Sequence, residues 1–146
     1  RATGLEAAMV DHSVVQIAAL EDGDDREFAL KVAGPSALLV AKMHKLGDRN
    51  DNDLERLNDK DAHDVYRLLV GVPTEVLVLS LGRLREDDLA GETTRKGLRF
   101  FEQLFAAGPD AIGCVMAGRA EELVGDPAFV SLAAATLAQD LLAGLI

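Results

Sequence analysis

The sequence predicts an α+β fold in which a small antiparallel sheet of about three strands is followed by a bundle of four to six helices. Short apolar runs separated by turn residues fill the first third, and apolar residues recur at helical spacing from Gly34 onward. Gly and Pro mark several expected helix ends. We expect a single domain over residues 1–146, because no repeat or low-complexity linker divides the chain.

The three expected strands are short apolar runs: LEAAMV (5–10), VVQIAAL (14–20) and FALKVA (28–33). Polar residues between the first two runs suit a turn, and the acidic segment around Gly23 suits a second one. In the third run Phe28, Leu30 and Val32 alternate with other residues, which is typical of a half-buried strand.

Helical spacing begins after Gly34, where Pro35 suits a first helical position. Leu39, Met43 and Leu46 then recur on one buried face, and Gly47 is expected to end this helix. The other helices are expected after a cap at Asn58 or Asp59, over Thr74–Leu84, over Glu92–Ala107, and from Pro127 after a cap at Asp126.

Composition limits the partners of the chain. A net charge of −10 repels phosphate backbones in general, so broad nucleic-acid binding is not favoured. Cys114 is the single cysteine of the sequence, which excludes an internal disulfide and fits a reducing cytoplasm. No apolar run approaches the roughly 20 residues of a membrane helix, so no membrane is expected. The missing initiator Met indicates a processed or excised piece of something longer.

The polar stretch AKMHKLGDRNDNDLERLNDKDAHDVYRLL (41–69) has three readings: a solvated surface, a calcium loop or part of an active site. Asp48, Asn50, Asn52 and Asp59 match positions 1, 3, 5 and 12 of a calcium loop. Asp53, however, stands where such a loop needs its turn glycine, and an aspartate replaces the final glutamate. A polar loop is therefore favoured over a calcium site.

The histidines and the cysteine are expected to be structural. His12, His44 and His63 have no close metal spacing, so each is expected at the surface or in a hydrogen bond. Cys114 has no neighbouring nucleophile signature and is expected to be a small buried residue. The aromatic residues of KGLRFFEQLF (96–105) are expected in the core.

Charged residues of the stretch gather on two helix faces. Lys42, Lys45 and Arg49 fall at i, i+3 and i+7, while Asp61 and Asp64 share a face at i, i+3. One reading is a salt-bridged surface. The sharper one is an inward-pointing Lys42 that meets phosphate while a carboxylate on the neighbouring helix holds it. That reading predicts a Lys42–Asp64 distance within about 4 Å, or one bridging water.

Residues 5–69 also resemble a known family, most clearly in VAGPSALLVAKMHKLGDR (32–49) followed by LNDKDAHDVYRLL (57–69). Both segments resemble AbiEii-type nucleotidyltransferase-like proteins, which include toxins of bacterial toxin–antitoxin systems. Their motif has the form K-x-x-A-(I/L)-x-x-R, a gap, and (R/K)-D-x-x-D-(L/V)-x-x-L. It is matched here by Lys42 for the lysine, Arg49 approximately for the arginine, Lys60 and Asp61 for the basic–acidic pair, and Asp64 for the second aspartate.

The resemblance implies transfer of a nucleotide from a nucleoside triphosphate (NTP) to an RNA or protein acceptor. It implies catalytic roles for Lys42 and Asp64, and nucleotide binding by Lys42, Arg49, Lys60 and Asp61. The family's metal-binding signature, a Gly-Ser turn followed by an Asp-x-Asp strand, does not occur in the sequence. The chain is therefore expected to be a C-terminal portion that is not catalytically complete alone, with Mg²⁺ expected only alongside an upstream motif.

Two further expectations concern partners. The alternative to a nucleotidyltransferase-like enzyme is a non-enzymatic helical protein-interaction module, whose acidic surface serves solubility or a basic partner protein. In either case an open edge of a truncated sheet would leave backbone N–H and C=O groups free to pair with another chain. Self-association of this chain through such an edge is therefore expected.

Overall fold

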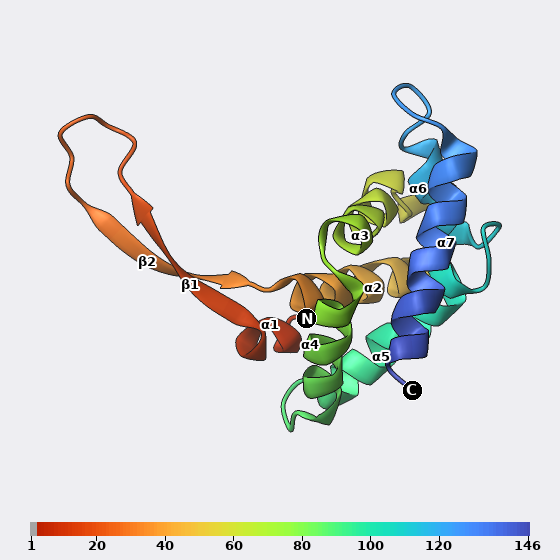
Figure 1. Ribbon diagram of the computed structural model, residues 1–146, viewed down its shortest axis with the longest axis horizontal. Coiled ribbons are helices and arrows are strands. Elements are labelled where there is room, and N and C mark those ends of the chain that lie inside the picture. Colours follow the sequence, from red (N-terminus) through yellow and green to blue (C-terminus); the bar gives the residue numbers. More distant parts are fainter. Residues whose placement is uncertain (1–2) are drawn as a thin grey trace.

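The computed structural model describes residues 3–146, and within them it has seven α-helices and one two-stranded antiparallel sheet (Figure 1). The α+β class is confirmed, and six of these helices follow the sheet. The elements are α1 (Glu6–Val10), β1 (His12–Ala18), β2 (Glu27–Ala33), α2 (Pro35–Asn52), α3 (Asp59–Gly71), α4 (Thr74–Glu86), α5 (Gly91–Phe101), α6 (Ile112–Arg119) and α7 (Pro127–Gly144). A 3₁₀ turn, η1 (Leu54–Arg56), follows α2, and a π-helical turn, η2 (Glu102–Ala106), follows α5.

The first predicted strand is wrong, because residues 6–10 form helix α1. The sequence there is rich in Ala, Glu and Met, which favour a helix, and Ala7 is fully buried against the core. The sheet therefore has two strands rather than about three.

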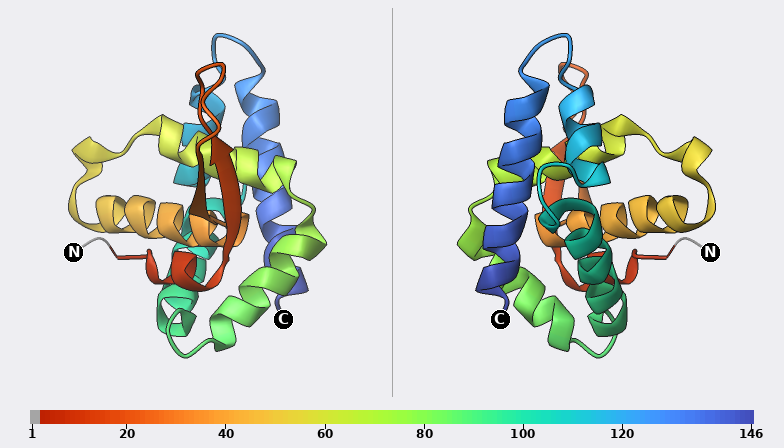
Figure 2. Two further views of the ribbon diagram at one scale, coloured as in Figure 1. Left: turned by 90° about the vertical axis from the view of Figure 1, so that its left-hand side faces the viewer. Right: turned by 90° about the vertical axis from the view of Figure 1, so that its right-hand side faces the viewer.

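Strands β1 and β2 form a hairpin that projects from the helical body (Figures 1 and 2). The predicted turn lies at its tip, where Gly23 has a φ of +87°. The prediction of a half-buried strand is wrong, since β2 is exposed from Glu27 to Val32. At its base the hairpin is fixed by Asp11, whose carbonyl accepts from Gly34 N and whose carboxylate accepts from Ala37 N.

Helix α2 begins at Pro35 as predicted, and Leu39, Met43 and Leu46 are buried. The predicted end at Gly47 is wrong, because α2 continues to Asn52. A Cβ at Gly47 would overlap the ring of Phe100 on α5. The glycine therefore serves close helix packing here rather than helix termination.

The later helices agree largely with the sequence. Asn58 caps α3, Asp126 caps α7, and α4 begins at Thr74 and ends two residues beyond the expected Leu84. The helix expected over residues 92–107 is divided into α5 and the π-helical turn. Helix α6 was not predicted, since the glycines in it lower helix propensity.

The core lies among α2–α7 and is filled mainly by Leu, Ala and Phe side chains. Phe101 and Phe105 stack with ring centroids 5.8 Å apart, so the aromatic segment is core as predicted. Cys114 is buried and donates its thiol hydrogen to the carbonyl of Phe105. Against the expectation from the sequence, helix α7 is by length and composition long and apolar enough to cross a membrane; one of its faces, which includes Ala134 and Leu141, is buried in this core.

Candidate functional site

Helices α2 and α3 lie side by side and are joined through η1 (Figure 2). Helix α2 buries its Leu39/Met43 face, and α3 buries Ala62, Val65 and Leu69. This leaves the charged residues of both helices at the margin of the contact between them. Helix periodicity together with the packing of α2 against α3 thus brings side chains about 20 positions apart into one cluster.

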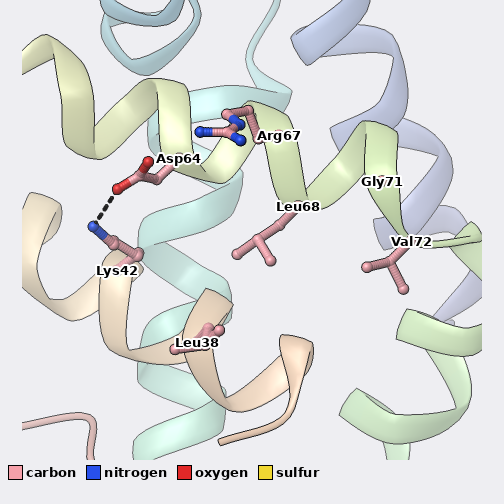
Figure 3. A pocket seen from close by; sticks show the side chains of 7 residues that line it. All are labelled: Leu38, Lys42, Asp64, Arg67, Leu68, Gly71 and Val72. Carbon is pink, nitrogen blue, oxygen red and sulfur yellow. Dashed lines mark hydrogen bonds and ion pairs between the residues drawn. The ribbon is translucent and has the colours of Figure 1, made fainter. Parts of the chain in front are cut away.

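Lys42 is the centre of this cluster. Its ammonium lies 2.9 Å from Asp61 Oδ1 and 2.7 Å from Asp64 Oδ2, and Figure 3 shows the second contact. The predicted Lys42–Asp64 contact is confirmed. Asp61 and Asp64 reach the same lysine because they are three residues apart on one helical face.

Asp61 collects two more cations from α2. Lys45 Nζ lies 2.7 Å from its carboxylate, and Arg49 Nη1 lies 3.1 Å from Oδ2. The Asp61 side chain is only 6% exposed. A buried carboxylate is tolerated when charged hydrogen bonds satisfy its oxygens, and three cations do so here. Asp61 is thus the internal anchor of the cluster.

Lys42 and Asp61 are both charged at neutral pH. Burial by itself would lower the pKa of Lys42, but hydrogen bonds to Asp64 and Asp61 and their charges raise it above the ordinary lysine value. Burial would raise the pKa of Asp61, but hydrogen bonds from Lys45 and Lys42 lower it below the ordinary value. The two directions agree, since each partner favours the charged form of the other.

Two cavities meet at Lys42. The first has a volume of about 430 Å³ and a largely apolar wall, which consists of Leu38, Leu68, Gly71 and Val72, with Lys42, Asp64 and Arg67 at the polar part (Figure 3). The second has a volume of about 650 Å³, and four of its lining residues are basic; it is lined by Thr3, Leu5, Leu38, Ala41, Lys42, Lys45, Asp48, Arg49 and Arg56. We call these the apolar pocket and the basic groove.

The structure brings most, but not all, of the predicted site residues together. Lys42, Arg49, Asp61 and Asp64 belong to the cluster. Lys60 does not: its side chain is exposed, and it lines neither the apolar pocket nor the basic groove. Neighbouring residues on a helix point about 100° apart, so the basic–acidic pair of the motif is separated.

Sequence reasoning gave no site role to Lys45, Arg56 or Arg67. Lys45 could have been found, because it shares a helical face with Lys42 and Arg49. Arg56 reaches the groove through the η1 turn, and Arg67 lies one turn beyond Asp64 at the pocket. Neither position follows from spacing, since the path of η1 and the depth of the pocket depend on tertiary packing.

The calcium-loop reading is wrong, and so is the favoured polar loop over residues 48–52, because these residues are helical. Asp48, Asn50 and Asn52 lie within helix α2, and Asn52 Nδ2 donates to the carbonyl of Asp48. Among residues 3–146, no group of three His, Cys, Asp or Glu side chains is arranged to hold a metal ion. The carboxylates of Asp61 and Asp64 are already paired with Lys42, so they do not fit the expected Mg²⁺.

Two of the histidines have the hydrogen bonds expected of structural residues. His44 is buried, with Nε2 2.8 Å from the carbonyl of Thr93 and its ring edge-on to Phe100. His63 pairs with Glu121, which joins α3 to the segment after α6. Burial raises the pKa of the Cys114 thiol to about 11, so this cysteine is a poor nucleophile.

Comparisons with models of protein families, with curated proteins and with solved structures give no match.

Proposed function

We propose that this chain is the C-terminal portion of a nucleotidyltransferase-like protein, and that the Lys42 cluster binds the phosphates of an NTP. The observation that carries the proposal is the Lys42 ammonium, fixed by Asp61 and Asp64 where a basic groove meets an apolar pocket. The nucleotide would be transferred to an RNA or protein acceptor.

Charge supports a phosphate ligand. Three cations, Lys42, Lys45 and Arg49, share two carboxylates, so one positive charge remains in the cluster. Arg56 also lines the groove; it is 69% exposed and forms a loose ion pair with Asp53, at 3.8 Å. Fixed cations cost little reorganisation when an anion arrives, which is how enzymes stabilise phosphoryl groups.

Shape supports a nucleotide rather than free phosphate. The basic groove and the apolar pocket share Leu38 and Lys42, so one ligand can occupy both. Each volume is within the range of about 300–1,000 Å³ usual for small-molecule sites. A triphosphate would lie along the groove, with the nucleobase against Leu68 and Val72.

The chemistry assigned to this chain is electrostatic. An acceptor hydroxyl attacks the α-phosphorus, the bond to the bridging oxygen breaks, pyrophosphate leaves with that electron pair, and the hydroxyl proton passes to water. Lys42 would neutralise charge that develops on the phosphate oxygens, while Asp61 and Asp64 position it. Among residues 3–146 no group of three His, Cys, Asp or Glu side chains is arranged to hold a metal ion, so Mg²⁺ would be held by the upstream motif of a longer protein.

Equilibrium dialysis of this chain with each of the four common NTPs tests the phosphate site. We expect weak binding that falls at least about tenfold in Lys42→Ala. Lys60→Ala is the matched control, because Lys60 is exposed on α3 and lines neither cavity. No binding by the wild type, or equal binding by Lys42→Ala, contradicts the proposal.

The exposed hairpin favours a second candidate, a non-enzymatic module that binds another protein. Its strands leave Val14, Ile17 and Phe28 exposed, and the helical body does not use them for its core. This function predicts no NTP binding by the wild type. The dialysis experiment therefore separates the two candidates.

A further inference from the structure

One face of the β1–β2 hairpin is an apolar strip. In the register, Val15 faces Leu30 and Ile17 faces Phe28, and cross-strand partners lie on the same side of a sheet. With Val32, these five residues form what we call the apolar strip, and they are 40–58% exposed. The opposite face carries pairs such as Val14 with Lys31 and Gln16 with Ala29. This division is typical of a sheet that buries one face.

Nothing in residues 3–146 covers the apolar strip. Two-stranded hairpins are marginally stable in water unless a further strand or an apolar surface packs on them. Figure 1 shows that this hairpin extends beyond the helices, so the body offers no such surface. A contiguous patch of this kind marks an interaction site.

We propose that the apolar strip packs against the same strip of a second copy of this chain, with the two hairpins antiparallel about a two-fold axis. An interface of this kind is isologous, so one patch that is complementary to itself suffices. The proposal goes beyond the nucleotide site; because the tip of the second copy and a triphosphate would both occupy the basic groove, the dimer and an NTP would compete.

Charge complementarity favours a second copy over an unrelated partner. The hairpin tip, EDGDDRE (21–27), contains five carboxylates and one arginine. The base of the hairpin leads directly into α2, whose Lys42, Lys45 and Arg49 line the basic groove and keep one positive charge after their pairing with Asp61 and Asp64. Antiparallel hairpins place the tip of one copy at the base of the other. The acidic tip would therefore meet the basic groove of the second copy.

The area of the apolar strip indicates that the hairpin tip must also belong to the dimer interface. A patch of five side chains that are about half exposed amounts to a few hundred Å² per copy at most. A stable dimer usually buries roughly 800 Å² on each partner. The strip alone is too small, and contact between the tip and the groove supplies the remainder. Salt should therefore weaken the dimer, since charges form part of the interface.

Sedimentation velocity on the whole chain tests the strip. We expect a dimer at about 100 µM, and a dissociation constant raised at least about tenfold in Leu30→Thr, because both copies lose apolar area. Val14→Thr is the matched control: Val14 is 61% exposed on the same hairpin but lies on the opposite face. Threonine keeps β propensity, and circular dichroism checks that the helical body remains folded.

A charge exchange tests the orientation. One chain carries Asp22→Lys with Asp25→Lys at the tip, and the other carries Arg56→Glu at the groove. Each should dimerise more weakly than the wild type alone, whereas a mixture should form heterodimers in excess of either homodimer. A monomeric wild type at about 100 µM, equal weakening by Leu30→Thr and Val14→Thr, or no heterodimer preference each overturns the proposal.

Discussion

Phe101 in the helical body is fully buried, whereas Phe28 in the hairpin is 58% exposed. The carboxylates of the two regions also differ in burial. Asp61 is enclosed by three cations, while Asp24 pairs with Arg26 at the exposed hairpin tip. The body buries its large apolar side chains and its central carboxylate, whereas the hairpin leaves both kinds of side chain at the surface. The two regions should therefore differ in how strongly each residue is coupled to global unfolding.

The largest difference is expected for the two phenylalanines. Phe101→Ala removes a fully buried ring and should lower the free energy of unfolding by roughly 3–5 kcal/mol, because it leaves a cavity. Phe28→Ala should change the free energy of unfolding by less than about 0.5 kcal/mol. Urea denaturation at low protein concentration measures both variants. Comparable losses in both variants would show that the hairpin is part of the core.

Two glycines give the second comparison. Gly47→Ala should cost roughly 1–3 kcal/mol of unfolding free energy, because its Cβ would overlap the Phe100 ring and push α5 away from α2. Gly23→Ala strains a turn residue with φ of +87°, yet its Cβ meets no atom within 4 Å.

We expect the strain at Gly23 to open the hairpin without moving the thermal midpoint of the body. Hydrogen exchange of the hairpin amides, alongside thermal melting, separates the two effects. A lowered midpoint in Gly23→Ala, or an unchanged one in Gly47→Ala, would contradict this division.

Gly47 also shows where the sequence stops being informative. Periodicity placed the buried face of α2 and the charged faces of α2 and α3, so the Lys42–Asp64 contact could be predicted. The sequence does not distinguish a glycine that ends a helix from one that leaves room for an aromatic ring. Here the ring is that of Phe100 on α5, more than 50 residues away. Helix α1 was missed for a related reason: LEAAMV is apolar enough for a strand, and burial of Ala7 decides between the two.

The smallest of the expected effects concerns two aspartates and has a defined pH dependence. The pKa of Asp61 is lowered in the folded state, where cations oppose the effect of burial. At a pH above the pKa of Asp61 in the unfolded state, near 4, the ionised carboxylate therefore contributes fully to stability. This contribution is lost as the pH falls through the lower pKa of the folded state. Asp61→Asn should cost about 1–2 kcal/mol at pH 7, a value reduced by the partial exposure of its lysine partners. It should also flatten the loss of stability in acid.

Asp24 provides the matched test in the hairpin. Its pKa is also lowered, by hydrogen bonds from Arg26, so its own ionisation responds to acid in the same direction as that of Asp61. If the hairpin opens independently of the body, this proton uptake does not enter the unfolding equilibrium of the helices. Urea denaturation from pH 7 down to about pH 3 should then give the same curve for Asp24→Asn as for the wild type. A flattening equal to that of Asp61→Asn would mean that the hairpin and the body unfold as one unit, and the contrast between the regions would fail.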